Sequence, residues 1–119
     1  MNSAVAQSSS SARSVLTSVY NERLNQIFNN GYDANHDDMH GNAELLYAAV
    51  TYLLAAVQPD VADHIVQTYW PFELEYFKPS VIPQKMLTVA AAFVVAEIER
   101  INRLEDAQND TAIVSSIID

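Results

Sequence analysis

The sequence predicts an all-α protein, a small single-domain helical bundle of three long helices, one short helix and an aromatic loop. In the long segments, apolar residues recur at spacings of three and four, which is the period of an amphipathic helix. Before residue 107, no stretch alternates apolar and polar residues as a half-buried strand does. Half of the 119 residues are apolar, which suffices for one modest core.

Composition divides the chain into three parts. Residues 1–12 are rich in serine, and we expect them to form a disordered leader. The helical domain is expected over residues 13–106. The tail, residues 107–119, is compatible with a frayed helix, an edge strand or an oligomer arm.

The first two long helices are predicted from apolar spacing and from residues that end helices. Residues 11–31 place Val15, Val19 and Leu24 on one face and end at Gly31, which favours the left-handed cap of a helix. Residues 43–58 are apolar nearly all round, so this helix is expected to be central and buried. Its broad apolar face comprises Leu45, Ala49, Val50, Leu53, Leu54 and Val57.

A short helix is expected over residues 60–70, followed by the aromatic segment. Pro71 and Pro79 forbid regular helix there, so we interpret it as an ordered loop packed over the helices. The last long helix begins at Pro83, a favoured first-turn residue, and continues to residue 106. The stripe expected to face the core comprises Leu87, Ala90, Val94, Ile98 and Ile101.

The charge distribution indicates which kinds of molecule the protein can bind. The net charge is −9, from 15 acidic and 6 basic residues, and no Lys or Arg occurs between Arg23 and Lys78. Nucleic-acid binding depends on neutralised phosphates, so the acidic centre argues against direct DNA or RNA binding. It suits a divalent metal or a basic partner protein.

Several features bear on the compartment. There are no cysteines, which excludes disulfides and thiolate metal sites. No stretch reaches the roughly 18 apolar residues of a membrane span, so we expect no membrane association. The N-terminus lacks the basic start and apolar centre of a signal peptide, which predicts a cytoplasmic protein.

The segment NHDDMHGNAEL, residues 35–45, is the main candidate site. Its ionisable residues are His36, Asp37, Asp38, His40 and Glu44. Imidazole and carboxylate groups together can bind a divalent metal such as Mg, Mn or Zn. The structural alternative is a polar loop in which the aspartates cap a helix and the histidines bond backbone carbonyls.

An enzymatic interpretation is a metal-dependent nucleotide (pyro)phosphohydrolase of the all-α type. Metal would bridge Asp37 and Asp38 with Glu44 or Glu97, and His40 or Glu22 would act as the base. The placement of Glu22, Glu44 and Glu97 on three helices is similar to MazG-type enzymes, although the E-E-x-x-E motif of that family is absent. This interpretation requires the carboxylates to converge.

The aromatic loop also allows two interpretations. Trp70, Phe72, Tyr76 and Phe77 form either a stacking platform for a base or partner, or a hydrophobic lid over a small core. Lys78, the single base of this loop, either contacts a phosphate or pairs with a carboxylate such as Asp37 or Glu97.

Four segments, in order, resemble a family of short proteins encoded by tailed phages and prophages. They are ERLNQI (22–27), GYDANHDDMHGNAEL (31–45), YWPFELEYFKP (69–79) and AEIERINR (96–103). The sequence departs from that family in the spacing of G-N-A-E-L, in W-P-F for W-P-W, and in lacking a basic pair after K-P. The resemblance implies functional positions at Glu22, Arg23, Gln26, His36, Asp37, Asp38, His40, Glu44, Trp70, Lys78, Glu97 and Arg100.

These observations together predict a small phage-type accessory protein in the host cytoplasm. We expect it to bind a host protein or a nucleotide-like ligand through an acidic polar pocket between helices, with countering a host defence as the role that such an origin suggests. A homo-oligomer is expected, because the apolar side chains of the aromatic loop and the tail would otherwise be exposed to solvent.

Overall fold

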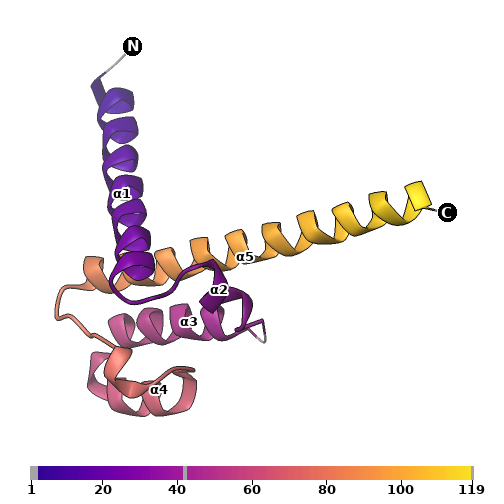
Figure 1. The fold of residues 1–119 in the computed structure, drawn as a ribbon. Helices are drawn as coiled ribbons and strands as arrows, with labels where there is room; N and C mark the ends of the chain where they lie inside the picture. Colours follow the sequence, from indigo (N-terminus) through magenta and orange to yellow (C-terminus); the bar gives the residue numbers. More distant parts are fainter. Residues whose placement is uncertain (1–2, 42, 119) are drawn as a thin grey trace.

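A computed structural model describes residues 3–41 and 43–118 of the chain. Five helices occur in order: α1 (Ser3–Phe28), α2 (Ala34–Asp38), α3 (Glu44–Val57), α4 (Ala62–Tyr69) and α5 (Pro83–Ile118) (Figure 1). Two short 3-10 turns, η1 (Pro59–Val61) and η2 (Leu74–Tyr76), flank α4. The described residues contain no strand, so the all-α prediction is confirmed.

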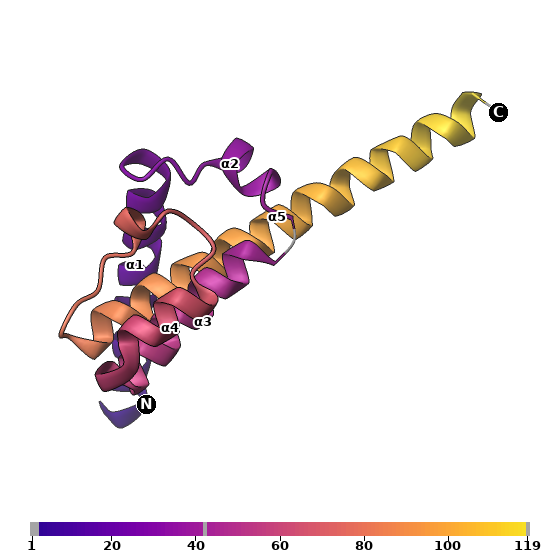
Figure 2. The same ribbon diagram turned by 90° about the horizontal axis from the view of Figure 1, so that it is seen from below.

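The core lies mainly between α3 and α5, which run side by side in both ribbon views (Figures 1 and 2). Alanines on both helices, including Ala48 and Ala96, are almost completely buried and let the two backbones approach closely. Tyr52, Trp70 and Phe93 fill the space beside these small residues. Helix α4 packs against α3 on the side away from α1.

The faces that enter the core differ from those expected. On α5, Leu87, Val94, Ile98 and Ile101 are exposed, whereas Met86, Phe93, Ala96 and Glu97 are buried and only Ala90 belongs to both sets. On α3, Leu45 and Ala49 of the expected face are buried as predicted, but Ala48, Thr51 and Ala55 outside that face are buried too, while Leu53 and Val57 are exposed. Since apolar residues surround both helices, periodicity does not select the buried side, and the closest approach is made where alanines lie between the helices.

The helix boundaries differ from the expectation at two places, and at a third they decide between the alternatives that the sequence left open. Helix α2 lies inside the segment we expected to be a loop; Asp33 caps it by accepting a hydrogen bond from the His36 amide at 3.0 Å. Residues 3–12, expected to be a disordered leader, form the first turns of α1, and residues 107–118 continue α5 as a helix. Neither extension contains Gly or Pro, so no residue interrupts the backbone hydrogen bonds. Gly31 ends the first helical region with a positive φ of 77°, as predicted.

The molecule is extended. Its radius of gyration is 17.8 Å, whereas a compact chain of this length has about 13.5 Å. The N-terminal part of α1 and the C-terminal part of α5 project from the core in different directions (Figure 1). Among the described helices, none alone is long and apolar enough to cross a membrane; Glu44–Val57 with Pro59–Tyr69 would qualify by length and composition only as a pair bent by 119°.

Candidate functional site

Arg23 is the centre of a buried ion-pair network. Its guanidinium donates to Asp37 Oδ2 at 2.8 Å, to Glu99 Oε1 at 2.8 Å and to the Tyr32 carbonyl at 2.9 Å. Arg23 is 5% exposed and Asp37 is fully buried. His36 Nδ1 lies 3.0 Å from the other oxygen of Asp37. One arginine of α1 therefore holds both the α2 segment and α5.

Two further arginines of α5 neutralise neighbouring carboxylates. Arg100 bonds the buried Glu97 one turn before it, and its guanidinium also lies near Gly41. Arg103 donates to Asp38 at 2.8 Å. Glu99 and Arg103 are four residues apart on α5, a spacing that allows a surface pair within the helix, but each is bound to a residue of another helix.

The acidic residues consequently do not form the open acidic pocket that the sequence predicts. The expected metal ligands were Asp37, Asp38, His40, Glu44 and Glu97. Three of these carboxylates are bound to arginines, and His40 Nδ1 lies 4.0 Å from Glu44 Oε1. In the part of the chain that the structure describes, no group of three or more His, Cys, Asp or Glu side chains is placed to hold a metal ion. The hydrolase interpretation thus lacks the convergence of carboxylates that it requires.

Two other predicted positions are buried in packing. Trp70 is 9% exposed, donates from Nε1 to the Glu73 carbonyl at 2.9 Å and packs edge-on against Phe77 and Phe93. Gln26 is 1% exposed; its Nε2 donates to the Val89 carbonyl at 3.4 Å, and its Oε1 has no partner within the described residues. For Trp70 and Phe77, this geometry supports the lid interpretation of the aromatic loop.

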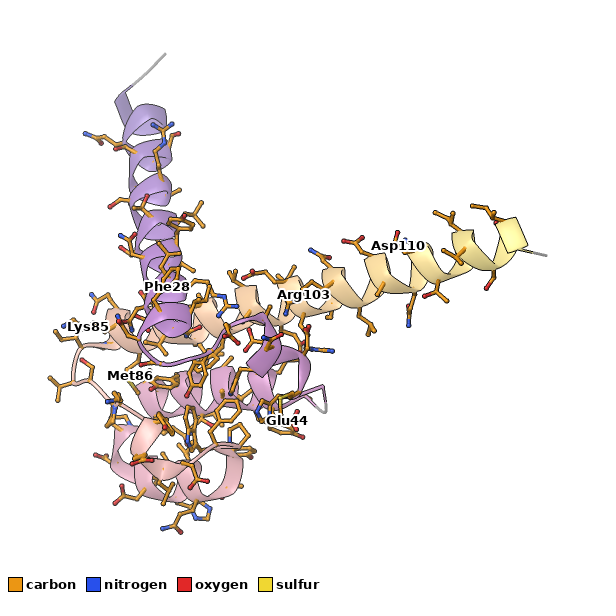
Figure 3. The ribbon with its side chains drawn as sticks, in the orientation of Figure 1. Phe28, Glu44, Lys85, Met86, Arg103 and Asp110 are labelled. Carbon is orange, nitrogen blue, oxygen red and sulfur yellow. The ribbon has the colours of Figure 1, made fainter. Side chains whose placement is uncertain are left out.

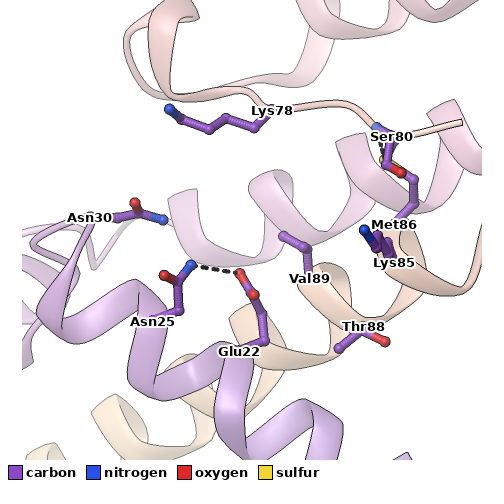
Figure 4. Close-up of a pocket in the computed structure, with 9 residues that line it drawn as sticks. All are labelled: Glu22, Asn25, Asn30, Lys78, Ser80, Lys85, Met86, Thr88 and Val89. Atoms are coloured by element: carbon purple, nitrogen blue, oxygen red, sulfur yellow. Dashed lines mark hydrogen bonds between the residues drawn. The ribbon is translucent and has the colours of Figure 1, made fainter. Parts of the chain in front are cut away.

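A cleft that we call the lysine cleft opens between α1, the segment after η2 and the start of α5 (Figure 4). Its volume is about 530 Å³. Lys78 and Glu22 lie on opposite sides of it (Figure 4). The lining residues are Glu22, Asn25, Asn30, Lys78, Ser80, Lys85, Met86, Thr88 and Val89.

The electrostatics of the lysine cleft differ from those of the rest of the molecule. Neither Lys78 nor Lys85 makes an ion pair within the described residues, so the expected pairing of Lys78 with Asp37 or Glu97 does not occur. Burial raises the pKa of the Glu22 carboxyl, and a hydrogen bond from Asn25 opposes this only in part. An anion entering the cleft would meet two unpaired ammonium groups and one carboxyl that protonates more readily than usual.

A second cleft, the histidine cleft, shares the lining residue Asn30 with the lysine cleft and has a volume of about 400 Å³. It is lined by Asn30, Tyr32, His36, His40, Pro71, Phe72, Glu73 and Tyr76. The rings of His36 and His40 are 4.4 Å apart, and Phe72 lies 5.0 Å from His40, edge to face. The hydroxyl of Tyr32 is buried without a hydrogen-bond partner in the described part of the chain.

Sequence reasoning found some of these lining residues and missed others. It named Glu22, His36 and His40 as members of one acidic site, and Lys78 as a base of the aromatic loop, whereas Glu22 and Lys78 line one cleft and the two histidines line another. Lys85, Asn25, Asn30 and Tyr32 were not singled out. Lys85 could have been found as one of the few basic residues that no carboxylate neutralises. That criterion requires knowing which carboxylates the arginines bind, and this depends on the fold.

Comparison of the chain with models of known protein families, with curated proteins and with solved structures found no match. The resemblance of its motifs to short tailed-phage proteins therefore stays a prediction. The function is argued below from the geometry of the two clefts.

Proposed function

We propose that the protein binds a nucleotide-like ligand, with its phosphates in the lysine cleft and its base in the histidine cleft. The observation that carries the proposal is the position of Lys78 and Lys85. They are the two bases of the folded core without a carboxylate partner among the described residues, and both line one cleft of a protein with a net charge of −9. Phosphate oxygens satisfy such ammonium groups with charge-assisted hydrogen bonds.

The position of the second cleft supports a ligand with a planar ring. Asn30 lines both clefts, so the two are adjacent, as a single ligand of nucleotide size would require. Tyr32, His36, Phe72 and Tyr76 present aromatic rings there, and base–aromatic stacking contributes about 1–3 kcal/mol per base.

In a phage-type accessory protein, such binding would remove a nucleotide signal from the host cytoplasm and so counter a host defence. The pairing of Asp37, Asp38 and Glu97 with arginines supports binding as the first function to test. The metal-dependent hydrolase remains the enzymatic alternative, and turnover of the nucleotide would identify it.

The test is calorimetric titration with inorganic pyrophosphate and, separately, with ADP. Lys78→Met and Lys85→Met should each weaken both affinities about tenfold to a hundredfold, the effect of losing one charge-assisted hydrogen bond. Arg103→Met, which also removes one positive charge but lies outside the cleft, should leave both affinities unchanged.

A second variant separates the two halves of the site. Tyr76 is exposed at the histidine cleft, so Tyr76→Ala should weaken ADP binding and leave pyrophosphate binding unchanged. The proposal fails if the wild-type protein binds neither compound, or if the lysine variants bind both as tightly as the wild type does.

A further inference from the structure

Two helical arms project from the core into solvent. Residues 7–18 of α1 and residues 104–117 of α5 are all exposed. In Figure 3, Asp110 stands on the projecting part of α5, well beyond Arg103 at the edge of the core. Isolated helical segments of this length are marginally stable in water, and the serine-rich arm of α1 has modest helix propensity. Packing against a partner would therefore stabilise both arms, and no other described part of the chain packs against them.

The α1 arm presents a continuous groove, which we call the arm groove. Its outer part is a shallow depression lined by Ser9, Ala12, Arg13, Leu16, Thr17 and Tyr20. Its inner part is a mainly apolar hollow between α1 and α5, where Leu16, Tyr20, Leu24 and Val95 meet. Small residues at the outer end and large apolar ones at the inner end form a surface suited to another helix.

The α5 arm carries a face that matches this groove. From Val95 at the groove, the helix face continues at spacings of three and four through Glu99, Asn102, Asp106, Asp110, Ile113 and Ile117. Ile113 and Ile117 on this face are more than half exposed. The face is therefore acidic along most of its length and apolar near the C-terminal end of the helix.

We propose that the α5 arm of a second copy of this chain lies antiparallel in the arm groove, and that the contact is repeated reciprocally about a two-fold axis. The two arms match in length, because residues 3–20 and 104–118 extend about 27 Å and about 22 Å as helices. They also match in charge. Arg13 is the sole charged residue of 3–20, while Glu105, Asp106 and Asp110 are the charged residues of 104–118.

The antiparallel direction follows from the helix dipoles, because it sets the positive N-terminal end of α1 beside the negative C-terminal end of α5. The two-fold axis makes the contact reciprocal, so that each copy contributes one α1 arm and one α5 arm. In this arrangement Arg13 of one copy lies beside the acidic stretch of the other, and the isoleucines of the α5 arm are covered.

Cross-linking tests the proposal directly, because the chain has no cysteine of its own. Arg13→Cys and Asp110→Cys are made as separate variants, mixed in equal amounts and oxidised mildly. The expected product is the mixed disulfide dimer, in excess over either homodimer. Disulfides of Arg13→Cys with itself as the main product would overturn the arrangement, since they would pair α1 with α1.

Light scattering after size exclusion supplies the stoichiometry. The wild-type protein should have the mass of two chains, and Leu16→Glu and Ile113→Glu should each shift it to one chain at the same concentration. Val81→Glu is the matched control; Val81 is 99% exposed outside both arms, so this variant should stay dimeric. A wild-type monomer, or a Leu16→Glu dimer as tight as the wild type, would refute the proposal.

Discussion

Removing the Arg23 side chain should be among the most destabilising changes in this protein. The variant Arg23→Met keeps the apolar stem and deletes a guanidinium that bonds two carboxylates and one carbonyl. Asp37 is fully buried and would lose its cationic partner. Breaking a buried pair in this way costs about 3–5 kcal/mol, because one charge is left without compensation in a site that excludes water. The Glu99 contact adds little, since that carboxylate is 42% exposed.

This loss is readily measured. The unfolding entropy of a 119-residue chain near its midpoint is about 250 cal/mol/K. A loss of 3–5 kcal/mol therefore lowers Tm by about 12–20 °C. Urea and thermal unfolding, followed by far-ultraviolet circular dichroism and by the fluorescence of Trp70, the single tryptophan, give both quantities at matched protein concentration.

Two comparison variants decide whether the buried pair is the cause. Arg103→Met removes a guanidinium whose partner, Asp38, is 50% exposed, so it should cost no more than about 1 kcal/mol. The double variant Arg23→Met with Asp37→Leu replaces both charges by apolar groups and should recover much of the loss. If Arg23→Met and Arg103→Met prove equally costly, or if the double variant is no more stable than Arg23→Met alone, the reasoning is refuted.

The remaining predictions concern single side chains in the core and the lysine cleft. Phe93→Ala should cost about 3–5 kcal/mol, because Phe93 is 2% exposed and joins the aromatic residues to α3; a urea midpoint close to that of the wild type would contradict this. Tyr32→Phe should raise stability by up to about 1 kcal/mol by removing a buried hydroxyl without a partner, whereas Tyr52→Phe should lower it by about 1 kcal/mol, since its hydroxyl accepts the Lys78 amide hydrogen bond at 2.9 Å. Burial raises the pKa of the Glu22 carboxyl, so its contribution to stability is fully present below the ordinary glutamate pKa and is lost as pH rises through the folded-state pKa. Glu22→Gln should therefore stabilise the protein at about pH 7.5, where Glu22 is charged, and the gain should disappear near about pH 4. Denaturation curves of the two proteins at both pH values measure this difference.

Local chemistry determined much of the secondary structure. Gly31 marks the end of the first helical region because its positive φ suits glycine, and Pro83 begins the last helix because proline is tolerated in a first turn. The long three-four spacings identified the long helices. The short α2 was missed because its signal, the cap at Asp33, spans only a few residues.

The site depended on contacts between distant parts of the chain. The sequence identified Arg23, Asp37 and Glu97 as candidate positions, but it did not identify the residues that they bind. An arginine binds the carboxylate that lies nearest in space, which is set by the fold. Arg23 and Glu99 are separated by 76 residues, and Arg103 and Asp38 by 65. The sequence alone offered 15 acidic residues for six bases.

The same limit applied to the helix faces. Both α3 and α5 have apolar residues on several sides, so periodicity could show that these segments are helices without showing which side is buried. The decision came from packing, since alanines on both helices permit the closest approach. Local sequence thus determined the main helical segments of this protein. Tertiary packing decided which residues are buried and which charges are paired, and it left Lys78 and Lys85 without a carboxylate partner around one cleft among the described residues, because each of these outcomes depends on distances between helices.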